Sequence, residues 1–443
     1  MAPTRKPQIL KGFRDYLPEQ MLLRQEVMRR IRDVFEAHGF EPIDTPVLEY
    51  MEILTGKAGE NEKLMYHFQD AGEREIGLRY DLTVPLARFV AMHQNDIPMP
   101  FKRYHMAPVW RAEKPQRGRF REFWQCDADI VGVNSTLGDA EALSTFVDAF
   151  HAIGLKNVVV AINHRKLLEG LAMVAGVPAG QAVGVFRTID KLDKIGPEKV
   201  RAELVSQGAS EDSAEKILRV ITTRGTNEEL LQLAEQELGD MAFAVEELRE
   251  IVSHLQSLGV PSENYRIDLA LARGIDYYTG PVWEAQVEEP KVGSVGGGGR
   301  YDGLVGNFLG RDVPATGISL GIDRIIEVIQ EFDLLPTSKT TAQVAMVYVE
   351  QTFAHAGEIA RELRAAGFNV DQSLAHNKGI GAQLKYADRR GIPYAIIPGI
   401  DELANNQVSL KNLSSGDQQL VNRNELVATL ASLLTEGSVD GNE

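Results

Sequence analysis

The hydrophobic and polar positions of this chain change period several times along its 443 residues. Near the start, Leu23, Val27 and Ile31 open an apolar stripe with three- and four-residue steps, which predicts an amphipathic helix from Pro18 to about His38. Between about Lys166 and Pro261 aromatic residues nearly vanish, and Leu, Ala, Glu and Lys recur at helical spacing. Because strand patterns stand on both sides of this stretch, we interpret it as a helical insertion within a first domain.

Shorter patterns predict the other elements of that first domain. Asp81 precedes an apolar run and occupies the position of a helix N-cap. The expected helices cover residues 81–92, 139–152 and 322–331, and the expected strands cover 41–50, 65–69, 76–80, 158–162, 265–271, 282–287 and the Gly-rich stretch 293–303.

The longest strand pattern runs from Phe101 to Val131, where aromatic and β-branched runs flank a break at Pro115 and Gly118. This order predicts a strand, a loop and a second strand. Between Phe101 and Arg121 there are seven Lys and Arg residues against one acidic residue, Glu113, although the whole chain carries a net charge of −16. Such a basic hairpin suits a polyanion, such as nucleotide phosphates or a nucleic-acid backbone. A solvated edge strand is the structural alternative.

The far end of the hairpin favours the functional interpretation. Gln125, Asp127 and Asp129 are spaced two apart, so their side chains share one face of a strand. Arg111 could reach that face from the partner strand. An amide, carboxylates and a guanidinium on one sheet face suit the recognition of a small zwitterion better than they suit packing.

Beyond a linker at residues 333–341 the pattern changes again. Strand and helix patterns alternate from residue 342 to residue 435, and residues 436–443 form a polar tail. Alternation of this kind predicts a mixed α/β domain with a mostly parallel sheet.

Composition restricts the class of protein. The length predicts two or three domains, and the lone Cys126 excludes an intrachain disulfide. The N-terminus does not resemble a signal peptide, and no apolar run approaches the ~20 residues of a membrane span. We therefore expect a cytoplasmic protein that does not associate with membranes.

Three further motifs carry candidate chemistry. Arg273-Gly274 followed by Tyr277-Tyr278 can be a simple glycine turn or an anion site with hydroxyl groups beside it. Residues 294–303 can be a flexible linker or a strand that admits a ligand close to its backbone, but their glycine spacing is not that of a P-loop. Residues 317–324 predict a strand that turns into a helix, with Arg324 in its first turn. The nine histidines show no zinc-site spacing, and we expect no protein-bound structural metal.

These motifs together resemble those of the class II aminoacyl-tRNA synthetases and, among them, of the histidyl-tRNA synthetase family. Pro46, the hairpin that opens at Arg111-Ala112-Glu113, and Gly321-Ile322-Asp323-Arg324 resemble the three general class II motifs. Residues 271–280 and 297–303 resemble the two histidine-specific signatures, and the resemblance covers nearly the whole chain. Asp81 stands where many bacterial members carry Glu.

The resemblance implies an α+β fold and a two-step reaction. A class II catalytic domain (residues 1–332), built on an antiparallel sheet with flanking helices, would be interrupted by the helical insertion at residues 166–261. Residues 342–435 would form an α/β anticodon-binding domain. Histidine would react with ATP, accompanied by Mg²⁺, to give histidyl-adenylate, and the histidyl group would then pass to the terminal ribose of tRNA(His).

The resemblance also implies roles for individual residues. Arg111 and Arg273 would stabilise the charge at the α-phosphate and contact histidine, and Arg119, Arg324 and Glu113 would hold the nucleotide. Asp81 and Thr83 would bind the histidine ammonium and Gln125 its carboxylate, while Asp129, Tyr277 and Tyr278 would form the imidazole site. Gln116 and Arg121 are candidates for contact with the tRNA acceptor end.

Two rival functions stay open at this point. A catalytically inactive relative of these synthetases regulates ATP phosphoribosyltransferase and lacks the anticodon-binding domain, and a tRNA-binding module without catalysis is also possible. The presence of Arg111, Arg273, Arg324 and the C-terminal domain favours the synthetase. The prolines at residues 42 and 46 mark an exposed strand that would need a covering partner, which predicts a homodimer.

Overall fold

The computed structural model describes residues 6–55, 63–177, 182–272, 277–287, 293–375 and 377–439. These described residues divide into two compact units. The larger unit contains residues up to 14 and residues 27–334, and the smaller unit contains residues 15–26 together with the chain from residue 335 onward. Among the described residues, no helix is long and apolar enough to cross a membrane.

The larger unit is organised around one broad sheet, whose strands have the order β1-β5-β6-β11-β10-β9-β7-β8. The neighbours from β5 to β7 pair antiparallel, whereas β1 with β5 and β7 with β8 form parallel pairs at the two edges. The expected antiparallel sheet is confirmed. The strands are β1 (Glu41–Pro42), β5 (Phe101–Trp110), β6 (Glu122–Val131), β7 (Val159–His164), β8 (Tyr265–Ile267), β9 (Pro281–Gln286), β10 (Ser294–Arg300) and β11 (Ala315–Gly321).

Alternation along these strands separates a core face from a polar face. Cys126, Ala128 and Ile130 of β6 are buried apolar residues that point to one side. On that side α4 (Thr136–Ala152) packs so closely that a Cβ at Gly296 of β10 would lie 2.8 Å from Phe146. The polar side chains of β6, Gln125, Asp127 and Asp129, point to the other face, which forms the candidate site.

The helices of the first domain match the expected pattern with small shifts. The helices α1 (Pro18–Ala37), α3 (Thr83–Met92) and α13 (Ile322–Phe332) confirm the periodic stripes, and α4 begins a few residues early because the Ser135 hydroxyl caps it. The sequence patterns did not reveal α2 (Met51–Thr55) and α12 (Gly303–Leu309). The Gly-rich strand therefore ends at Arg300 rather than at residue 303.

The segment predicted as one strand over residues 41–50 is two strands in different sheets. β1 lies at the edge of the broad sheet, whereas β2 (Leu48–Tyr50) belongs to a small sheet of order β2-β4-β3. The other strands of that sheet, β3 (His67–Gln69) and β4 (Glu75–Leu78), confirm the predicted pair. Pro42 and Pro46 explain the split, because neither proline can donate to a continuous ladder.

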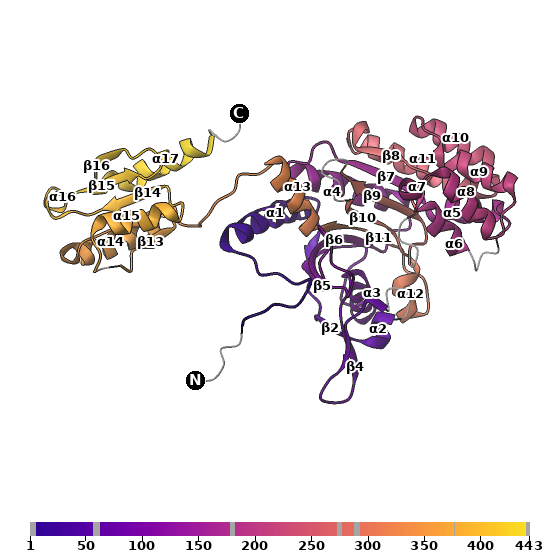
Figure 1. Ribbon diagram of the computed structural model, residues 1–443, viewed down its shortest axis with the longest axis horizontal. Coiled ribbons are helices and arrows are strands. Elements are labelled where there is room, and N and C mark those ends of the chain that lie inside the picture. Colours follow the sequence, from indigo (N-terminus) through magenta and orange to yellow (C-terminus); the bar gives the residue numbers. More distant parts are fainter. Residues whose placement is uncertain are drawn as a thin grey trace. The chain divides into compact units, whose positions relative to one another are not determined.

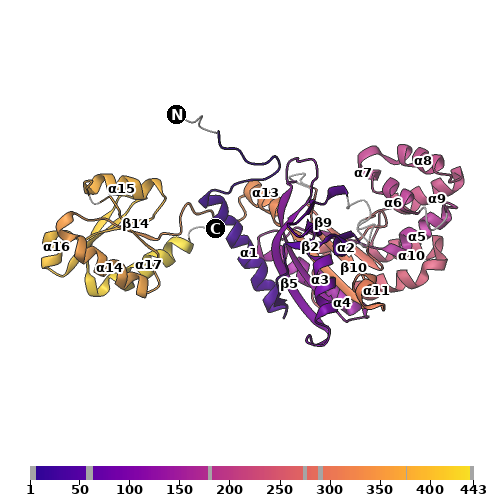
Figure 2. The same cartoon turned by 90° about the horizontal axis from the view of Figure 1, so that it is seen from below.

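Between β7 and β8 the described chain is helical, as the pattern predicted, and its helices gather at that edge of the sheet (Figure 1, Figure 2). Its last long helix, α11, packs against α4 and β7. The elements are α5 (Arg165–Val174), α6 (Ala182–Ile189), α7 (Leu192–Ile195), α8 (Pro197–Ser206), α9 (Glu211–Thr222), α10 (Asn227–Glu237) and α11 (Ala242–Ser257).

The smaller unit contains a sheet of order β13-β12-β14-β15-β16. The expectation of a mostly parallel sheet is wrong, because β14 with β15 and β15 with β16 pair antiparallel. The pattern missed β16, whose polar sequence buries only Val421 among the strand's residues. The elements are β12 (Val344–Met346), α14 (Phe353–Ala365), β13 (Val370–Gln372), α15 (Ile380–Arg389), β14 (Tyr394–Ile397), α16 (Ile400–Ala404), β15 (Gln407–Asn412), β16 (Gln418–Asn422) and α17 (Leu426–Val439).

Candidate active site

The hairpin of β5 and β6 supplies the first wall of the candidate site. Asp129 lies directly opposite Arg103, Asp127 opposite His105, and Gln125 opposite Ala107. The expectation that Gln125, Asp127 and Asp129 share a face is confirmed by this register. All three are buried, so their polar groups require partners.

Glycines on β10 and β11 leave room beside these carboxyl groups. Gly317 of β11 pairs with Asp129, and a Cβ at Gly317 would lie only 2.0 Å from Asp129 Oδ1. On the next strand, a Cβ at Gly299 would lie 2.9 Å from the Tyr278 ring. The Gly-rich stretch is therefore a strand rather than a linker, and its missing side chains bring other groups close to the sheet.

Asp129 is held by two residues that the sequence analysis did not assign to the site. Arg103 Nη2 lies 2.7 Å from Asp129 Oδ2, and the Tyr301 hydroxyl donates to Asp129 Oδ1. Burial raises the pKa of Asp129, and the Arg103 guanidinium and the Tyr301 hydrogen bond oppose that shift. Arg103 had been counted only as one of the hairpin cations. Tyr301 stands in the quoted Gly-Arg-Tyr-Asp-Gly motif, so a signal for it was present.

Gln125 and Asp127 form the next row of the same face. Gln125 Nε2 donates to the Ser319 hydroxyl at 2.7 Å and lies 3.5 Å from Asp127 Oδ1. Burial and the neighbouring Asp129 charge raise the pKa of Asp127 to about 8. The buried Gln125 Oε1 accepts no hydrogen bond from any residue that the structure describes, so an acceptor stays open on this face.

Asp81 and Thr83 lie where β4 leads into α3. The expectation that Asp81 is the N-cap of α3 is wrong by one residue, because the N-cap is Leu82. Asp81 Oδ1 nevertheless accepts the Val84 backbone N–H of the first turn at 3.0 Å. Burial raises the pKa of Asp81 to about 6, against the opposing charges of Arg111 and Arg103. Arg111 Nε donates to the Tyr80 carbonyl at 2.9 Å and packs over the Phe123 ring. Arg111 and Asp81 are therefore neighbours, as the predicted site requires.

The tyrosines enter the site from the segment before β9. The rings of Tyr277 and Tyr278 lie 4.8 Å apart, and Tyr277 meets Tyr301 edge to face at 6.1 Å. Burial raises the pKa of Tyr277 and of Tyr301 well above that of a free tyrosine, so both hydroxyl groups keep their protons. Tyr277 and Tyr278 thus lie beside Tyr301, whose hydroxyl binds Asp129.

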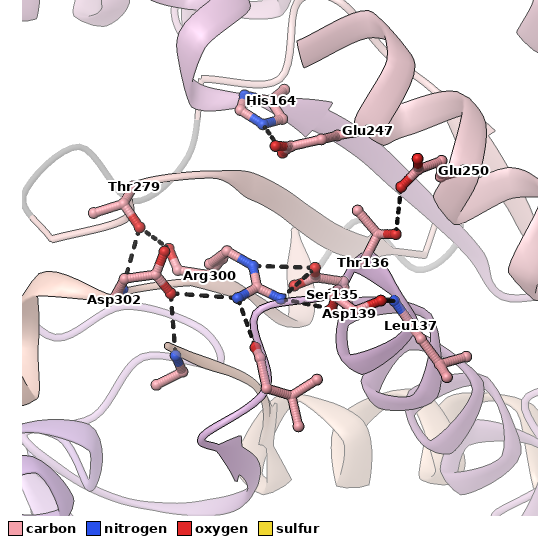
Figure 3. A network of polar contacts seen from close by, with 12 residues as sticks. Ser135, Thr136, Leu137, Asp139, His164, Glu247, Glu250, Thr279, Arg300 and Asp302 are labelled. Carbon is pink, nitrogen blue, oxygen red and sulfur yellow. Dashed lines mark hydrogen bonds and ion pairs between the residues drawn. The ribbon is translucent and has the colours of Figure 1, made fainter. Parts of the chain in front are cut away.

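A polar network holds Arg300 and Asp302, the chain neighbours of Tyr301 (Figure 3). Arg300 binds Asp139 of α4 with Nη2 at 2.7 Å from Oδ2, and it donates to the Val133 and Ser135 carbonyls. Asp302 lies 3.4 Å from Arg300 and accepts the Ala315 backbone N–H. The residues on both sides of Tyr301 are thereby anchored, and the ring between them cannot shift freely.

The hairpin tip and α13 form the other end of the site. Arg324 donates to the carbonyls of Gly118 and Ser294, and Arg119 lies 3.6 Å from Glu113. The expected nucleotide residues Glu113, Arg119 and Arg324 are thus brought together at the hairpin loop, while Arg111 lies at its base. Asp323, beside Arg324, accepts the Trp124 backbone N–H at 3.1 Å and pairs with Arg14.

The two candidates for contact with tRNA differ in their surroundings. Gln116 is exposed in the tight turn that its backbone forms with Arg119. Arg121 instead donates to the carbonyls of Glu113 and Lys11, so its guanidinium braces the N-terminal segment. Arg273, together with residues 274–276, lies outside the described residues.

Comparison with known proteins gives a consistent result over nearly the whole chain. A family model described as histidyl-tRNA synthetase matches residues 12–325, and one described as an anticodon binding domain matches residues 337–433. A histidine–tRNA ligase of Aeropyrum pernix is 44% identical over 436 residues, which cover 97% of this chain and 99% of the relative.

Solved structures give the same similarity. The histidyl-tRNA synthetase of Nostoc sp. PCC 7120 has a TM-score of 0.87 and 34% identity, covering 97% of this chain and all of that one. A protein of Bacillus halodurans, titled an ATP phosphoribosyltransferase regulatory subunit/histidyl-tRNA synthetase, has a TM-score of 0.74 and 26% identity, covering 87% of this chain and 96% of its own.

Proposed function

The chain belongs to the histidyl-tRNA synthetase family, and from this premise we propose that it is a histidine–tRNA ligase. The observation that carries the proposal is the match of both family models to one chain, because a ligase of this kind needs an activating domain and a tRNA-reading domain. We assign the activating role to residues 1–332, with the insertion at 166–261, and the tRNA-reading role to residues 342–435.

The reaction has two steps. A carboxylate oxygen of histidine attacks the α-phosphorus of ATP, the bond to the β-phosphate oxygen breaks, and diphosphate leaves. The terminal ribose hydroxyl of tRNA(His) then attacks the carbonyl carbon of the adenylate, and AMP leaves. The protein accelerates both steps by holding the reactants and by stabilising charge where it develops.

On the nucleotide side we assign Arg111 and Arg273 to the α-phosphoryl oxygens, where negative charge grows in the first step. Arginine suits this role because it stays charged and can bind two oxygens at once. Glu113, Arg119 and Arg324 hold the nucleotide, an assignment that their common place at the hairpin loop supports.

On the histidine side we assign the ammonium to Asp81 and Thr83 and the imidazole to Asp129, Tyr277 and Tyr278. Tyr301 joins the imidazole site because its hydroxyl binds Asp129. Gln125 was expected to bind the histidine carboxylate, but its open atom is an acceptor, so we assign it to the ammonium instead. The carboxylate then falls to Arg111 and Arg273.

Mg²⁺ is the metal that usually accompanies ATP, and it neutralises phosphate charge when it is bound. Among the described residues, no three His, Cys, Asp or Glu side chains are grouped in a way that could hold a metal ion. We therefore propose that phosphate oxygens supply most of its ligands.

Partners and location complete the proposal. We propose that the protein acts in the cytoplasm as a homodimer, with the small sheet in the subunit interface. Its two edge strands, β2 and β3, carry apolar side chains that a partner would cover: the exposed fraction is 44% for Leu48, 48% for Tyr50 and 44% for Phe68. For the tRNA acceptor end we retain Gln116, whereas Arg121 would contact it only by giving up its contacts to backbone carbonyls.

Histidine-dependent exchange between ATP and diphosphate tests the proposed function. The wild-type protein should catalyse exchange with histidine and not with the other amino acids. Arg111→Ala and Arg273→Ala should each reduce the rate by about 10²- to 10³-fold, because each removes one fixed cation from the transition state. The control is Arg361→Ala on α14. A regulatory subunit or a simple tRNA-binding protein would give no exchange, which would contradict the proposal.

A further inference from the structure

We propose that Arg103 is a positioning residue of the histidine site, which braces its imidazole side against its ammonium side. The inference rests on the proposed function, because it assigns Asp129 and residues 81–83 to the two ends of bound histidine. It goes beyond that function because it assigns a buried arginine of the hairpin to the histidine site rather than to the phosphates of the nucleotide.

The position of Arg103 is fixed by the strand register. It stands on β5 directly opposite Asp129 of β6, and its side chain is 0% exposed. Directly paired residues of neighbouring strands have their Cβ atoms close together on the same face. The guanidinium therefore reaches Asp129 from the side, with Nη2 at 2.7 Å from Oδ2.

The same nitrogen also reaches the other side of the site. Arg103 Nη2 lies 3.3 Å from the carbonyl oxygen of Leu82, to which it donates. Leu82 stands between Asp81 and Thr83, the residues assigned to the ammonium. One guanidinium thus contacts both Asp129, which we assign to the imidazole, and the backbone between the two residues that we assign to the ammonium. The distance between the imidazole site and the ammonium site determines which amino acid fits.

Stability alone is a weak reason for this pair. Burying a carboxylate and a guanidinium costs free energy that their attraction recovers only when the remaining donors are also bonded. Arg103 Nε and Nη1 form no hydrogen bond with any of the described residues, although they are buried. An apolar pair would serve the core at least as well, so the ion pair is better explained by the site that it adjoins.

Arg103 also keeps Asp129 in the form that can accept a hydrogen bond. Asp129 is faced by Arg103 of β5 and by Tyr301 after β10, with Tyr278 near Tyr301. Asp127, on the same face of β6, interacts electrostatically with both Asp129 and Asp81. Among the described residues, Arg103 is the cation that forms an ion pair with the Asp129 carboxylate. Without it, burial would favour the protonated acid, in which one of the two accepting oxygens becomes a donor, whereas the carboxylate can accept from both the Tyr301 hydroxyl and an imidazole N–H.

The test measures KM for histidine in the exchange reaction between pH 6.5 and pH 9. Arg103→Met should raise that KM by about 10- to 100-fold near neutral pH, with a smaller change in KM for ATP and in kcat. The loss should shrink as pH rises, because Asp129 then ionises without its cation. Arg103→Lys should recover most of the affinity, since it restores the charge.

A matched control comes from the same strand. Lys102 is the neighbouring cation on β5, but it pairs with Glu141 at 2.7 Å on the other side of the sheet. Lys102→Met should change KM for histidine less than about twofold, as expected for a charge change away from the site. Equal effects of Arg103→Met and Lys102→Met would overturn the inference.

A double variant covers the case in which Arg103→Met fails to fold. Arg103→Met with Asp129→Asn leaves no buried unpaired charge, so it should fold, and it should still bind histidine weakly. The inference is wrong if this variant keeps the wild-type KM, or if Arg103→Met lowers kcat and the affinities for both substrates equally at every pH.

If wild-type protein exchanges with histidine but Arg103 variants behave normally, only this inference fails. If wild-type protein gives no exchange, the proposed function fails with it.

Discussion

At the scale of single residues, the candidate site consists of short polar side chains that are buried beside one another. Asp127 and Asp129 are carboxyl groups on one face of β6, Asp81 precedes α3, and burial raises the pKa of each. Such a group is tolerated where a cation or a hydrogen-bond donor faces it. Arg103, Arg111 and the Tyr301 hydroxyl supply these partners, and the ammonium of histidine would supply another.

Tyr301→Phe tests the residue that the sequence analysis left out of the site. The change removes the hydroxyl that donates to Asp129 and keeps the ring against Tyr277. A hydrogen bond to a charged group contributes about 1.5–3 kcal/mol, so KM for histidine should rise by roughly 10- to 100-fold. Steady-state exchange kinetics measure it. Tyr104→Phe, which removes a hydroxyl bound to Glu36, is the control, and equal effects of the two would contradict the assignment.

Gly317→Ala tests the close approach of β11 to the site. The new methyl group would lie 2.0 Å from Asp129 Oδ1, so either the carboxyl group or the strand must shift. We expect a loss of about 1–3 kcal/mol in the free energy of unfolding and weaker histidine binding, measured by urea unfolding and by exchange. Gly381→Ala on α15 meets no atom within 4 Å and should be neutral. A neutral Gly317→Ala would show that Asp129 is not confined by this strand.

At the scale of the elements, the hairpin contributes most to the site because it contacts several parts of the larger unit at once. Its first strand faces β6, its loop covers Arg324, and its return strand binds Asp323 at the start of α13. The C-terminal end of α1 is fastened to α4 by a separate charged cluster of His38, Lys102, Glu141 and Asp148.

We predict that the contribution of His38 to stability depends on pH. Hydrogen bonds to Asp148 and Glu141 raise the pKa of His38 to about 9. A raised histidine pKa stabilises the fold fully below the unfolded value near 6.5, and this contribution is lost as pH rises towards 9. The difference in unfolding free energy between wild type and His38→Gln should therefore be larger at pH 6 than at pH 9, measured by urea unfolding. A difference that does not change with pH would contradict this account.

The contribution of Glu141 in the same cluster depends on pH in the opposite direction. The hydrogen bond from His38, supported by Lys102, lowers the pKa of Glu141 to about 2. Its contribution is present above the unfolded value near 4.5 and is lost as pH falls towards 2. The difference in unfolding free energy between wild type and Glu141→Gln should therefore be smaller at pH 3 than at pH 5, which the same urea unfolding measurements would check.

The sequence predicted the elements well where the pattern is local. The amphipathic stripe of α1, the hairpin and the insertion helices all repeat within a few residues, so their periods are visible without a fold. Residues 41–50 were interpreted wrongly because their partner strands, β5 and β4, belong to different sheets. In the smaller unit β16 was missed because its exposed face leaves a polar sequence with little period.

The site was predictable where a motif concentrates its residues and not where strands meet. Gln125, Asp127 and Asp129 alternate on one strand, so their common face followed directly from the period of two. Tyr301 is 172 residues from the carboxylate that it binds, and no local pattern joins them. Arg103 was visible as a charge, but only the register of β5 against β6 shows that it faces Asp129 rather than solvent.

At the scale of the whole molecule, the chain combines a strongly negative net charge with a local concentration of positive charge in the hairpin. Its net charge is −16, although the hairpin from Phe101 to Arg121 is strongly basic. Repulsion over most of the surface should limit non-specific binding of nucleic acid. Selection of one tRNA would then depend on the two units, each of which matches its own family model.

The measurement that tests this account most directly is aminoacylation of total tRNA by the purified protein with each labelled amino acid in turn. The account predicts that histidine, and no other amino acid, is transferred to tRNA in the presence of ATP, and that the product is tRNA(His). A protein that is folded but transfers no histidine under these conditions, or transfers a different amino acid, would contradict it.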